Sequence, residues 1–564
     1  MPNLIQEARD QIEDLISSAA AKAAEAGTLP SAGEDIKGSV DVPRDTRHGD
    51  FASAWALAAA KGFKMSPRVI AESVVKELEM DGSFFSAAEI AGAGFINFRF
   101  SDKWYREVLN AVETEGVNYG RSNYGGGERV MVEFVSANPT GLMTIGNARG
   151  GVLGDTLASV LDRAGYNVWR EFYVNDAGNQ VQLFAESLET RYIQLIKGED
   201  AVVFPENGYH GDDIWTLARA FREEQGDSWL DRDPVERKKA LTDFGLERNI
   251  AKMHIDLERY GIKFDCWYRE SALHASGCVE ETVEMLQSSG HTYEKDGALW
   301  LNLTDLGAEK DEVLRKSNGF YTYFAVDMAY HRDKFVKRNF CKVIDVLGAD
   351  HHGHAIRFKQ ALPAMGIDPD RLHFLIMQLV RLTKDGDTVR VSKRTGKAIT
   401  LSDLLDEITC DAVRFFFNSN PDTHLEFDMD LAIRQDSENP VYYVQYAHAR
   451  ICSLIENLHE EGVGVQKSAD IDMSKLDGEH ERKLIKSVAR LPEEIQNAAK
   501  NYDPSRINKY VQELAASFHS FYNNCRIKGE EPSLQAARLK LASATGRVIA
   551  CSLDILGVSA PEKM

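Results

Sequence analysis

The sequence of 564 residues predicts a multidomain α/β protein with a parallel central sheet and a helical C-terminal end. The chain is longer than one hydrophobic core supports. Strand-like and helix-like segments alternate over about 129–435, whereas helical periodicity alone runs through 436–564. We therefore predict an N-terminal domain (1–117), a glycine-containing linker (118–128), a central domain with an insertion at about 198–262, and a C-terminal domain.

The central domain begins with a predicted strand, turn and helix over 129–164. Val130, Val132 and Phe134 alternate with the residues between them, which predicts a strand. Residues 138–141 (NPTG) then break it, and apolar residues recur every three or four positions from Ala148. Such a turn can bind an anion, because free N–H groups and the helix dipole face it. From geometry alone, an ordinary βα unit remains the alternative.

Composition limits the class of protein and of partner. Hydrophobic content of 43% and charged content of 27% are typical of a globular protein. No apolar run is long enough to span a membrane, the N-terminus is unlike a signal peptide, and the seven Cys include no Cys-x-x-Cys pair. We therefore expect a cytoplasmic protein without a bound metal or membrane partner. The net charge of −21 argues against nonspecific coating of nucleic acid, so an RNA would need local basic and aromatic patches.

The N-terminal domain has helical periodicity at 1–27 and 67–78, followed by a predicted strand at 92–100. One face of this strand suits a core. The other, expected to be exposed, carries an aromatic ring, an amide and a cation: Phe95, Asn97 and Arg99. Together these groups could bind one unpaired base. An edge strand with a partly buried Phe is the alternative.

Two later segments carry candidate binding residues. Tyr323 and Asp327 are four residues apart and share a helical face, where a hydroxyl and a carboxylate could hold a guanidinium. Glu133 could add a second carboxylate, although a surface pair is the alternative. Residues 348–354 (GADHHGH) follow an apolar strand, at the end where α/β sheets bind ligands. Their three His and one Asp would also suit zinc.

Four motifs together resemble one family. They are GFINF (94–98), SANPTGLMTIGNARG (136–150), GADHHGH (348–354) and RVSKR (390–394). The second and fourth are similar to the two signatures of class I aminoacyl-tRNA synthetases, and the surrounding residues resemble the arginyl branch. This resemblance implies a Rossmann-like class I catalytic domain, an N-terminal α+β domain that contacts the tRNA elbow, and a C-terminal all-α helix bundle that binds the anticodon.

The implied activity is ATP-dependent ligation of L-arginine to its tRNA through arginyl-adenylate. The resemblance assigns catalytic roles to Thr144, Asn147 and Lys393. It assigns ATP contacts to Gly141, Gly146, Gly348, Asp350, His351, His354, Ser392 and Lys393, in preference to a zinc site. It assigns arginine contacts to Glu133, Asn138, Tyr323 and Asp327, and tRNA contacts to Phe95, Asn97 and Arg99.

The first signature departs from the family pattern, because Thr144 and Asn147 stand where two His usually stand. Both side chains still donate hydrogen bonds. The resemblance further implies Mg²⁺ accompanying ATP, tRNA binding before arginine activation, a monomer, and no DNA partner. Two alternatives stay open: a catalytically weak, synthetase-like RNA-binding or regulatory protein, and a nucleotidyltransferase that uses the same ATP loop without tRNA.

Overall fold

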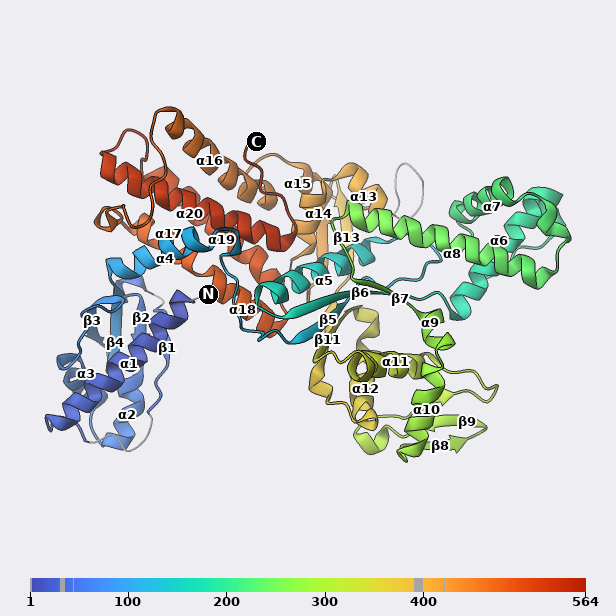
Figure 1. Ribbon diagram of the computed structural model, residues 1–564, viewed down its shortest axis with the longest axis horizontal. Helices are drawn as coiled ribbons and strands as arrows, with labels where there is room; N and C mark the ends of the chain where they lie inside the picture. The colour runs from blue at the N-terminus through green and yellow to red at the C-terminus, as the bar shows by residue number, and fades with distance from the viewer. Residues whose placement is uncertain (1–2, 31–35, 44, 390–398, 420) are drawn as a thin grey trace.

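The computed structural model describes residues 3–30, 36–43, 45–389, 399–419 and 421–564. In Figure 1 the N-terminal domain (blue) lies below the C-terminal helices at the left of the view, and a helical insertion labelled α6, α7 and α8 projects at the right. The central sheet lies between them. This arrangement confirms the predicted fold class.

The N-terminal domain packs helices on a four-stranded sheet with the order β1-β2-β4-β3, in which all pairs are antiparallel. Its elements are α1 (Leu4–Glu25), β1 (Val40–Asp41), β2 (Phe51–Ser53), α2 (Trp55–Phe63), α3 (Pro67–Lys76), β3 (Phe85–Ala91) and β4 (Phe95–Phe100). Ile96, Phe98 and Phe100 are buried, as predicted. The following helix α4 (Asp102–Glu115) leads toward the central domain.

The second face of β4 is only partly exposed, which corrects the prediction for Asn97. Phe95 is 41% exposed, but Asn97 is 6% exposed. Arg99 donates from Nη2 to the carbonyl of Arg47 at 2.7 Å, and a Cβ added at Gly49 would lie 3.6 Å from the Asn97 Cβ. The segment before β2 therefore lies across this face and covers Asn97. Sequence periodicity could not show this crossing.

The central domain is built on a five-stranded parallel sheet with the order β12-β11-β5-β6-β7. Its strands are β5 (Arg129–Glu133), β6 (Asn167–Val174), β7 (Cys266–Arg269), β11 (Lys342–Gly348) and β12 (Leu372–Met377). Helix α5 (Ile145–Arg163) connects β5 to β6. The predicted strand–turn–helix at 129–164 is thus present.

The strand β5 ends at Glu133, whereas the alternating pattern predicted a strand that continues to Val135. Val135 and Ser136 have positive φ values of 69° and 33°, so the chain leaves the sheet in a backbone conformation that a β-branched residue rarely adopts. Helix α5 then returns so close to Phe134 that a Cβ at Gly154 would lie 2.2 Å from its ring. A glycine is required at that position.

Two insertions flank the sheet edge. Helices α6 (Gly178–Lys197), α7 (Asp212–Gln225) and α8 (Pro234–Arg259) form a module with its own apolar core, and this module begins earlier than residue 198. The second insertion contains α9 (Glu270–Ala275), α10 (Cys278–Ser288), β8 (Thr292–Lys295), β9 (Ala298–Leu301) and β10 (Glu312–Arg315). It leads into α11 (Tyr323–Arg332) and the π-helical turn η6 (Asp333–Lys337), and α12 (His352–Ala361) follows β11.

The remaining central elements are β13 (Val380–Lys384), β14 (Asp387–Val389), α13 (Leu401–Glu407), α14 (Cys410–Phe417), β15 (Leu425–Asp428) and α15 (Met429–Ile433). The C-terminal helices are α16 (Pro440–Glu460), α17 (Glu479–Ala489), α18 (Leu491–Asn501), α19 (Ser505–Asn524) and α20 (Pro532–Leu556). Within the described part of the chain, no helix is both long and apolar enough to cross a membrane.

Candidate active site

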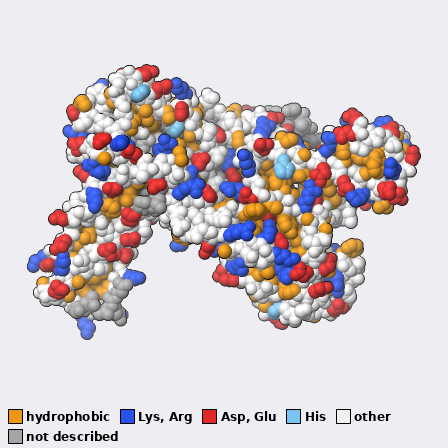
Figure 2. Space-filling view, viewed as in Figure 1, with side chains coloured by type: hydrophobic (Ala, Val, Ile, Leu, Met, Phe, Trp, Pro, Cys, Tyr) orange, Lys and Arg blue, Asp and Glu red, His pale blue; other side chains and the backbone are white. Residues whose placement is uncertain are grey.

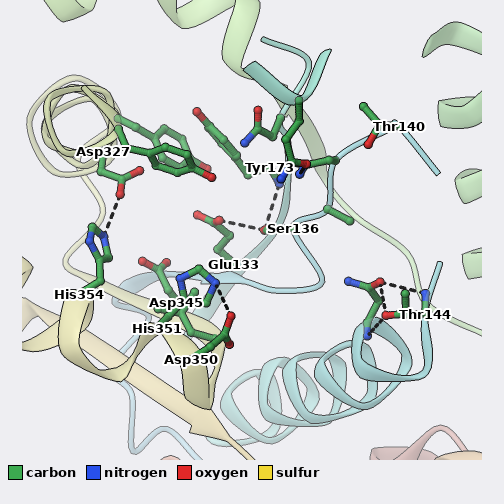
Figure 3. Close-up of a pocket in the computed structure, with 18 of the residues that line it drawn as sticks. Glu133, Ser136, Thr140, Thr144, Tyr173, Asp327, Asp345, Asp350, His351 and His354 are labelled. Carbon is green, nitrogen blue, oxygen red and sulfur yellow. Dashed lines mark hydrogen bonds and ion pairs between the residues drawn. The ribbon is translucent and has the colours of Figure 1, made fainter. Parts of the chain in front are cut away.

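A cavity of about 770 Å³ lies past the carboxyl ends of β5, β6 and β11. Most of the residues predicted to bind arginine or ATP or to act in catalysis line it (Figure 3): Glu133, Asn138, Gly141, Thr144, Asn147, Tyr323, Asp327, Asp350, His351 and His354. Volumes of this size accommodate small ligands and cofactors. Segments that are more than 200 residues apart in the printed sequence thus meet at one site.

One end of the cavity is the N-terminus of α5, where Thr144 is the N-cap residue. The Asn147 backbone N–H donates to Thr144 Oγ1 at 3.3 Å, and Asn147 Oδ1 accepts from the Thr144 backbone N–H at 3.0 Å and from its hydroxyl at 2.8 Å. The two residues that replace the family's His pair therefore form a capping box. Because Oδ1 is the acceptor in this box, Nδ2 is the atom of Asn147 that can donate to a ligand.

The opposite wall carries Asp327, which comes from α11 (Figure 3). Its Oδ2 lies 2.9 Å from Nε2 of His354. Tyr323 is one turn earlier on the same helix and is 71% exposed. Burial of its hydroxyl end, followed by the charges of Asp327 and Glu270, raises the pKa of Tyr323, so this phenol remains a hydrogen-bond donor at neutral pH. The predicted pair is thus available to one ligand.

A side wall of amides and hydroxyls was not predicted apart from Asn138. Asn138 donates to Oε1 of Gln180, which lies in the first turn of α6. Tyr173 and Asn175 also line the cavity. Asn175, with its amide oriented to satisfy its neighbours, donates to Glu270 Oε2 at 3.1 Å. Tyr173 is the last residue but one of β6, and Asn175 and Glu270 directly follow β6 and β7. Their position at the carboxyl ends of parallel strands was the signal in the sequence that could have identified them.

Behind the cavity lies a buried group of charges that joins Glu133, His331, Lys334 and Asp345. The Nζ atom of Lys334 is 2.5 Å from Glu133 Oε2 and 3.0 Å from Asp345 Oδ1, and His331 Nε2 is 2.8 Å from Asp345 Oδ2. Burial by itself would raise the pKa of Asp345, but Lys334 and His331 lower it to about 2. Burial raises the pKa of Glu133, against the opposing effect of Lys334. Glu133 therefore lines the cavity with its charge already balanced.

A second cavity of about 700 Å³ adjoins the first at the start of α5. Thr144 lines both cavities. The second is lined by apolar residues, among them Ile145, Val380, Leu382 and Val389, and by the polar residues Arg381, Thr388, His424 and Glu426. Thr144 forms an isolated antiparallel bridge with Thr400, and the Leu401 N–H donates to the Met143 carbonyl at 2.9 Å.

These contacts hold Thr400 and Leu401 beside the start of α5. The predicted Ser392 and Lys393 lie outside the described residues.

The loop 348–354 contributes residues with different exposures. Gly348 ends β11, and Asp350 and His351 are exposed beside each other, with His351 Nε2 at 3.5 Å from Asp350 Oδ2. His354 points instead to Asp327. In the described ranges, no group of three or more His, Cys, Asp or Glu side chains is arranged to hold a metal ion.

Thr144→Val should separate the capping role of this residue from its chemical role. Loss of the N-cap hydroxyl should destabilise α5 by about 1 kcal/mol. If the capping box also aims donors at the phosphates in the transition state, the barrier to adenylate formation should rise by more than this, because one such donor is worth about 3–4 kcal/mol. The measurement is single-turnover adenylate formation with tRNA present, and Thr144→Ser is the matched control. A parent-like rate for Thr144→Val would restrict the hydroxyl to capping.

Comparison with known proteins identifies the same family. Models of the arginyl-tRNA synthetase N-terminal domain, the class I (R) tRNA synthetase catalytic domain and the DALR anticodon-binding domain match residues 10–100, 109–451 and 444–564. Proteins named arginine–tRNA ligase from Acetivibrio thermocellus and Caldanaerobacter subterraneus are 50% and 51% identical, over 100% of this chain and of each relative.

Solved structures agree at the level of the fold. The arginyl-tRNA synthetase of Thermus thermophilus superposes with a TM-score of 0.73 at 22% identity, over 99% of this chain and 100% of that one. The three domain models follow one another in the order that the sequence motifs predicted. The chain belongs to the arginyl branch of the class I aminoacyl-tRNA synthetases.

Proposed function

We propose that the 770 Å³ cavity binds L-arginine with its guanidinium on Asp327 and Tyr323. The observation that carries this proposal is the position of Asp327, which faces the cavity from the wall opposite the N-terminus of α5 (Figure 3). A carboxylate and a phenol on one helical turn match the fork of N–H donors that a guanidinium presents. Asn138 is then placed for the α-amino and carboxylate end, and Glu133 for the cavity floor.

ATP is proposed to lie with its phosphates at the N-terminus of α5. Gly141 and Gly146 allow close approach of the phosphates, and the helix dipole and Asn147 Nδ2 favour negative charge there. Gly348, Asp350, His351 and His354 are assigned to ATP, and its adenine base is proposed to enter the adjoining second cavity, which Thr144 and Gly146 line. Mg²⁺ enters as the counter-ion of ATP, and Ser392 and Lys393 are assigned to the leaving phosphates on the basis of the sequence alone.

In this arrangement the arginine carboxylate attacks the α-phosphate, and the bond to the β-phosphate oxygen breaks to release pyrophosphate. The arginyl group then passes to a hydroxyl of the terminal ribose of tRNA, and AMP leaves. Negative charge increases on the departing pyrophosphate, so preorganised donors at α5 and the positive charge of Lys393 lower the barrier.

The guanidinium assignment can be tested with L-citrulline, which has the shape of arginine but carries no charge. Arginine should protect the protein against thermal unfolding in the presence of ATP and tRNA, and citrulline should not, because a neutral urea group loses the charge-assisted bond to Asp327. Equal protection by the two amino acids would contradict the assignment.

Transfer RNA is proposed to contact both ends of the chain. Phe95 and Arg99 remain accessible on β4, whereas Asn97 would contact RNA only after the covering segment moved. At the other end, a pocket of about 390 Å³ between α16 and α19 contains Tyr442, Tyr446, Arg450 and His519, which suits stacked bases. Figure 2 shows Lys and Arg side chains gathered on the central part of one face, despite the net charge of −21.

Phe95→Ala should weaken tRNA binding by about 1–3 kcal/mol through the loss of one stacked base. Filter binding of the cognate tRNA measures this change. Val69→Ala, an exposed position on α3 in the same domain, is the matched control and should bind tRNA like the parent. Parent-like binding by Phe95→Ala would show that β4 is only a sheet edge.

A cytoplasmic, monomeric protein fits these assignments. All seven Cys are free, as in proteins of reducing compartments, and one chain supplies every wall of the cavity.

A further inference from the structure

Lys334 is a fully buried charge behind the proposed arginine site. Its side chain has an exposure of 0%, and it lies in the π-helical turn η6, a widened turn that directs it toward the sheet. Its ammonium bridges two carboxylates from neighbouring parallel strands, Glu133 on β5 and Asp345 on β11, which are paired in the sheet register. Without a cation between them, two ionised carboxylates on paired positions of a buried sheet would repel each other strongly.

His331 joins the same buried group from α11. Its Nδ1 lies 2.9 Å from the Asp327 carbonyl oxygen, and its Nε2 lies 2.8 Å from Asp345 Oδ2. His331 therefore connects the backbone of α11 to the carboxylate of Asp345 on β11. Lys334 is the cation that contacts both carboxylates, Glu133 and Asp345, and His331 contacts Asp345 alone.

The other charged groups that face Lys334 are already paired. The Tyr330 ring lies 4.2 Å from the Lys334 ammonium. Glu171 on β6 accepts from Tyr330 Oη at 2.6 Å and from both terminal nitrogens of Arg338 at 2.6 and 3.0 Å. Within the described residues, the hydrogen bonds to the Glu133 carboxylate come from Lys334 and Ser136. Lys334 is therefore the cation that balances Glu133.

One hydrogen bond connects the buried charged group to each of the two cavity walls. Glu133 Oε1 accepts from the Ser136 hydroxyl at 2.9 Å, and Ser136 Oγ in turn accepts from the Tyr173 N–H at 3.3 Å. These two hydrogen bonds hold the turn at Val135 and Ser136, where positive φ values carry the chain out of the sheet toward Asn138. On the other wall, His331 bonds the backbone of Asp327 itself. Asp345 itself belongs to β11, three residues before Gly348, where that strand ends.

We propose that Lys334 is a positioning residue for arginine binding: by neutralising Glu133 and Asp345 together, it holds the two cavity walls at the separation that L-arginine needs. Lys334 touches no substrate in this account. The inference rests on the proposed arginine site, and it adds that the site depends on a cation behind the wall.

The test is a double-mutant cycle of Lys334→Met and Glu133→Gln in the full chain, with the KM for arginine measured in aminoacylation at saturating ATP and tRNA. Met keeps the length of the side chain and removes its charge, and Gln keeps an acceptor for Ser136. Lys334→Met should raise the KM for arginine about tenfold or more and leave the KM for ATP nearly unchanged. In the Glu133→Gln background the same change should have a much smaller effect, because the unbalanced carboxylate is gone.

The pH profile separates positioning from simple packing. Without Lys334, a proton must replace the ammonium between the two carboxylates, so the defect of Lys334→Met should grow as the pH rises from about 6.5 to 8.5. Equal defects in both backgrounds and at every pH would show a packing role and overturn the proposal, as would a folded Lys334→Met variant with a parent-like KM. A parent that fails to charge tRNA with arginine would instead refute the proposed function.

Discussion

Replacing Asp327 with Asn should raise the arginine requirement of aminoacylation by about 30- to 4,000-fold, with the ATP requirement nearly unchanged. This range corresponds to about 2–5 kcal/mol, the cost of truncating one partner of a buried charged pair. Asn keeps the size of the side chain, so the cavity shape persists while the guanidinium loses its counter-charge. Steady-state kinetics with each substrate varied in turn measures the effect.

The contact between Asp327 and His354 needs its own control, because the Asn variant also changes that bond. His354→Gln retains a hydrogen-bond donor for Asp327, and it should raise the arginine requirement much less than Asp327→Asn. An equal loss for arginine and ATP in Asp327→Asn would indicate a folding defect and contradict the assignment of Asp327 to the guanidinium.

Replacing Arg414 with Met should destabilise the protein by about 3–5 kcal/mol, since the partly buried Asp155 carboxylate loses its 2.6 Å partner and keeps only the 3.6 Å contact with Arg170. Arg414 is fully buried on α14. It donates to Asp155 of α5 at 2.6 Å, to the Tyr260 carbonyl at 3.0 Å and to the Leu556 carbonyl at 3.0 Å. It thus ties the central helix α5 to the end of α20, close beneath Gly557.

The denaturant midpoint of the full chain measures this loss. Arg434→Met is the matched control, because Arg434 pairs with Glu438 at the surface, where such pairs contribute about 0–1 kcal/mol. Asp155→Asn in the Arg414→Met background should restore part of the stability, because the carboxylate that lost its closer partner is gone. Equal midpoints for Arg414→Met and Arg434→Met would contradict the proposed role of this link between domains.

The sequence predicted the parallel sheet and the strand–turn–helix at 129–164, because a change from period two to a helical period depends on local residues alone. It also placed Tyr323 and Asp327 on one helical turn, which the structure confirms. It missed the capping box, since Asn147 replaces the Glu or Gln usual at that position. The early end of β5 was missed because nothing local indicates positive φ at Val135.

Contacts between distant segments could not be predicted from periodicity. Lys334 meets Glu133 across 201 positions of the chain, and only the parallel pairing of β5 with β11 brings Asp345 to the same point. Likewise, Asn97 alternates like an exposed residue, but the segment before β2 covers it. The roles of Ser392 and Lys393 rest on sequence alone, since residues 390–398 are not described.

The most direct measurement is the charging of unfractionated tRNA, with ATP and Mg²⁺ present, by each proteinogenic amino acid in turn. The account predicts that arginine alone is transferred, that the product is acid-precipitable arginyl-tRNA, and that Asp327→Asn abolishes transfer at low arginine. Tight tRNA binding without transfer of any amino acid would favour a regulatory RNA-binding protein. Nucleotide transfer that is independent of tRNA would favour a nucleotidyltransferase, and either result would contradict the account.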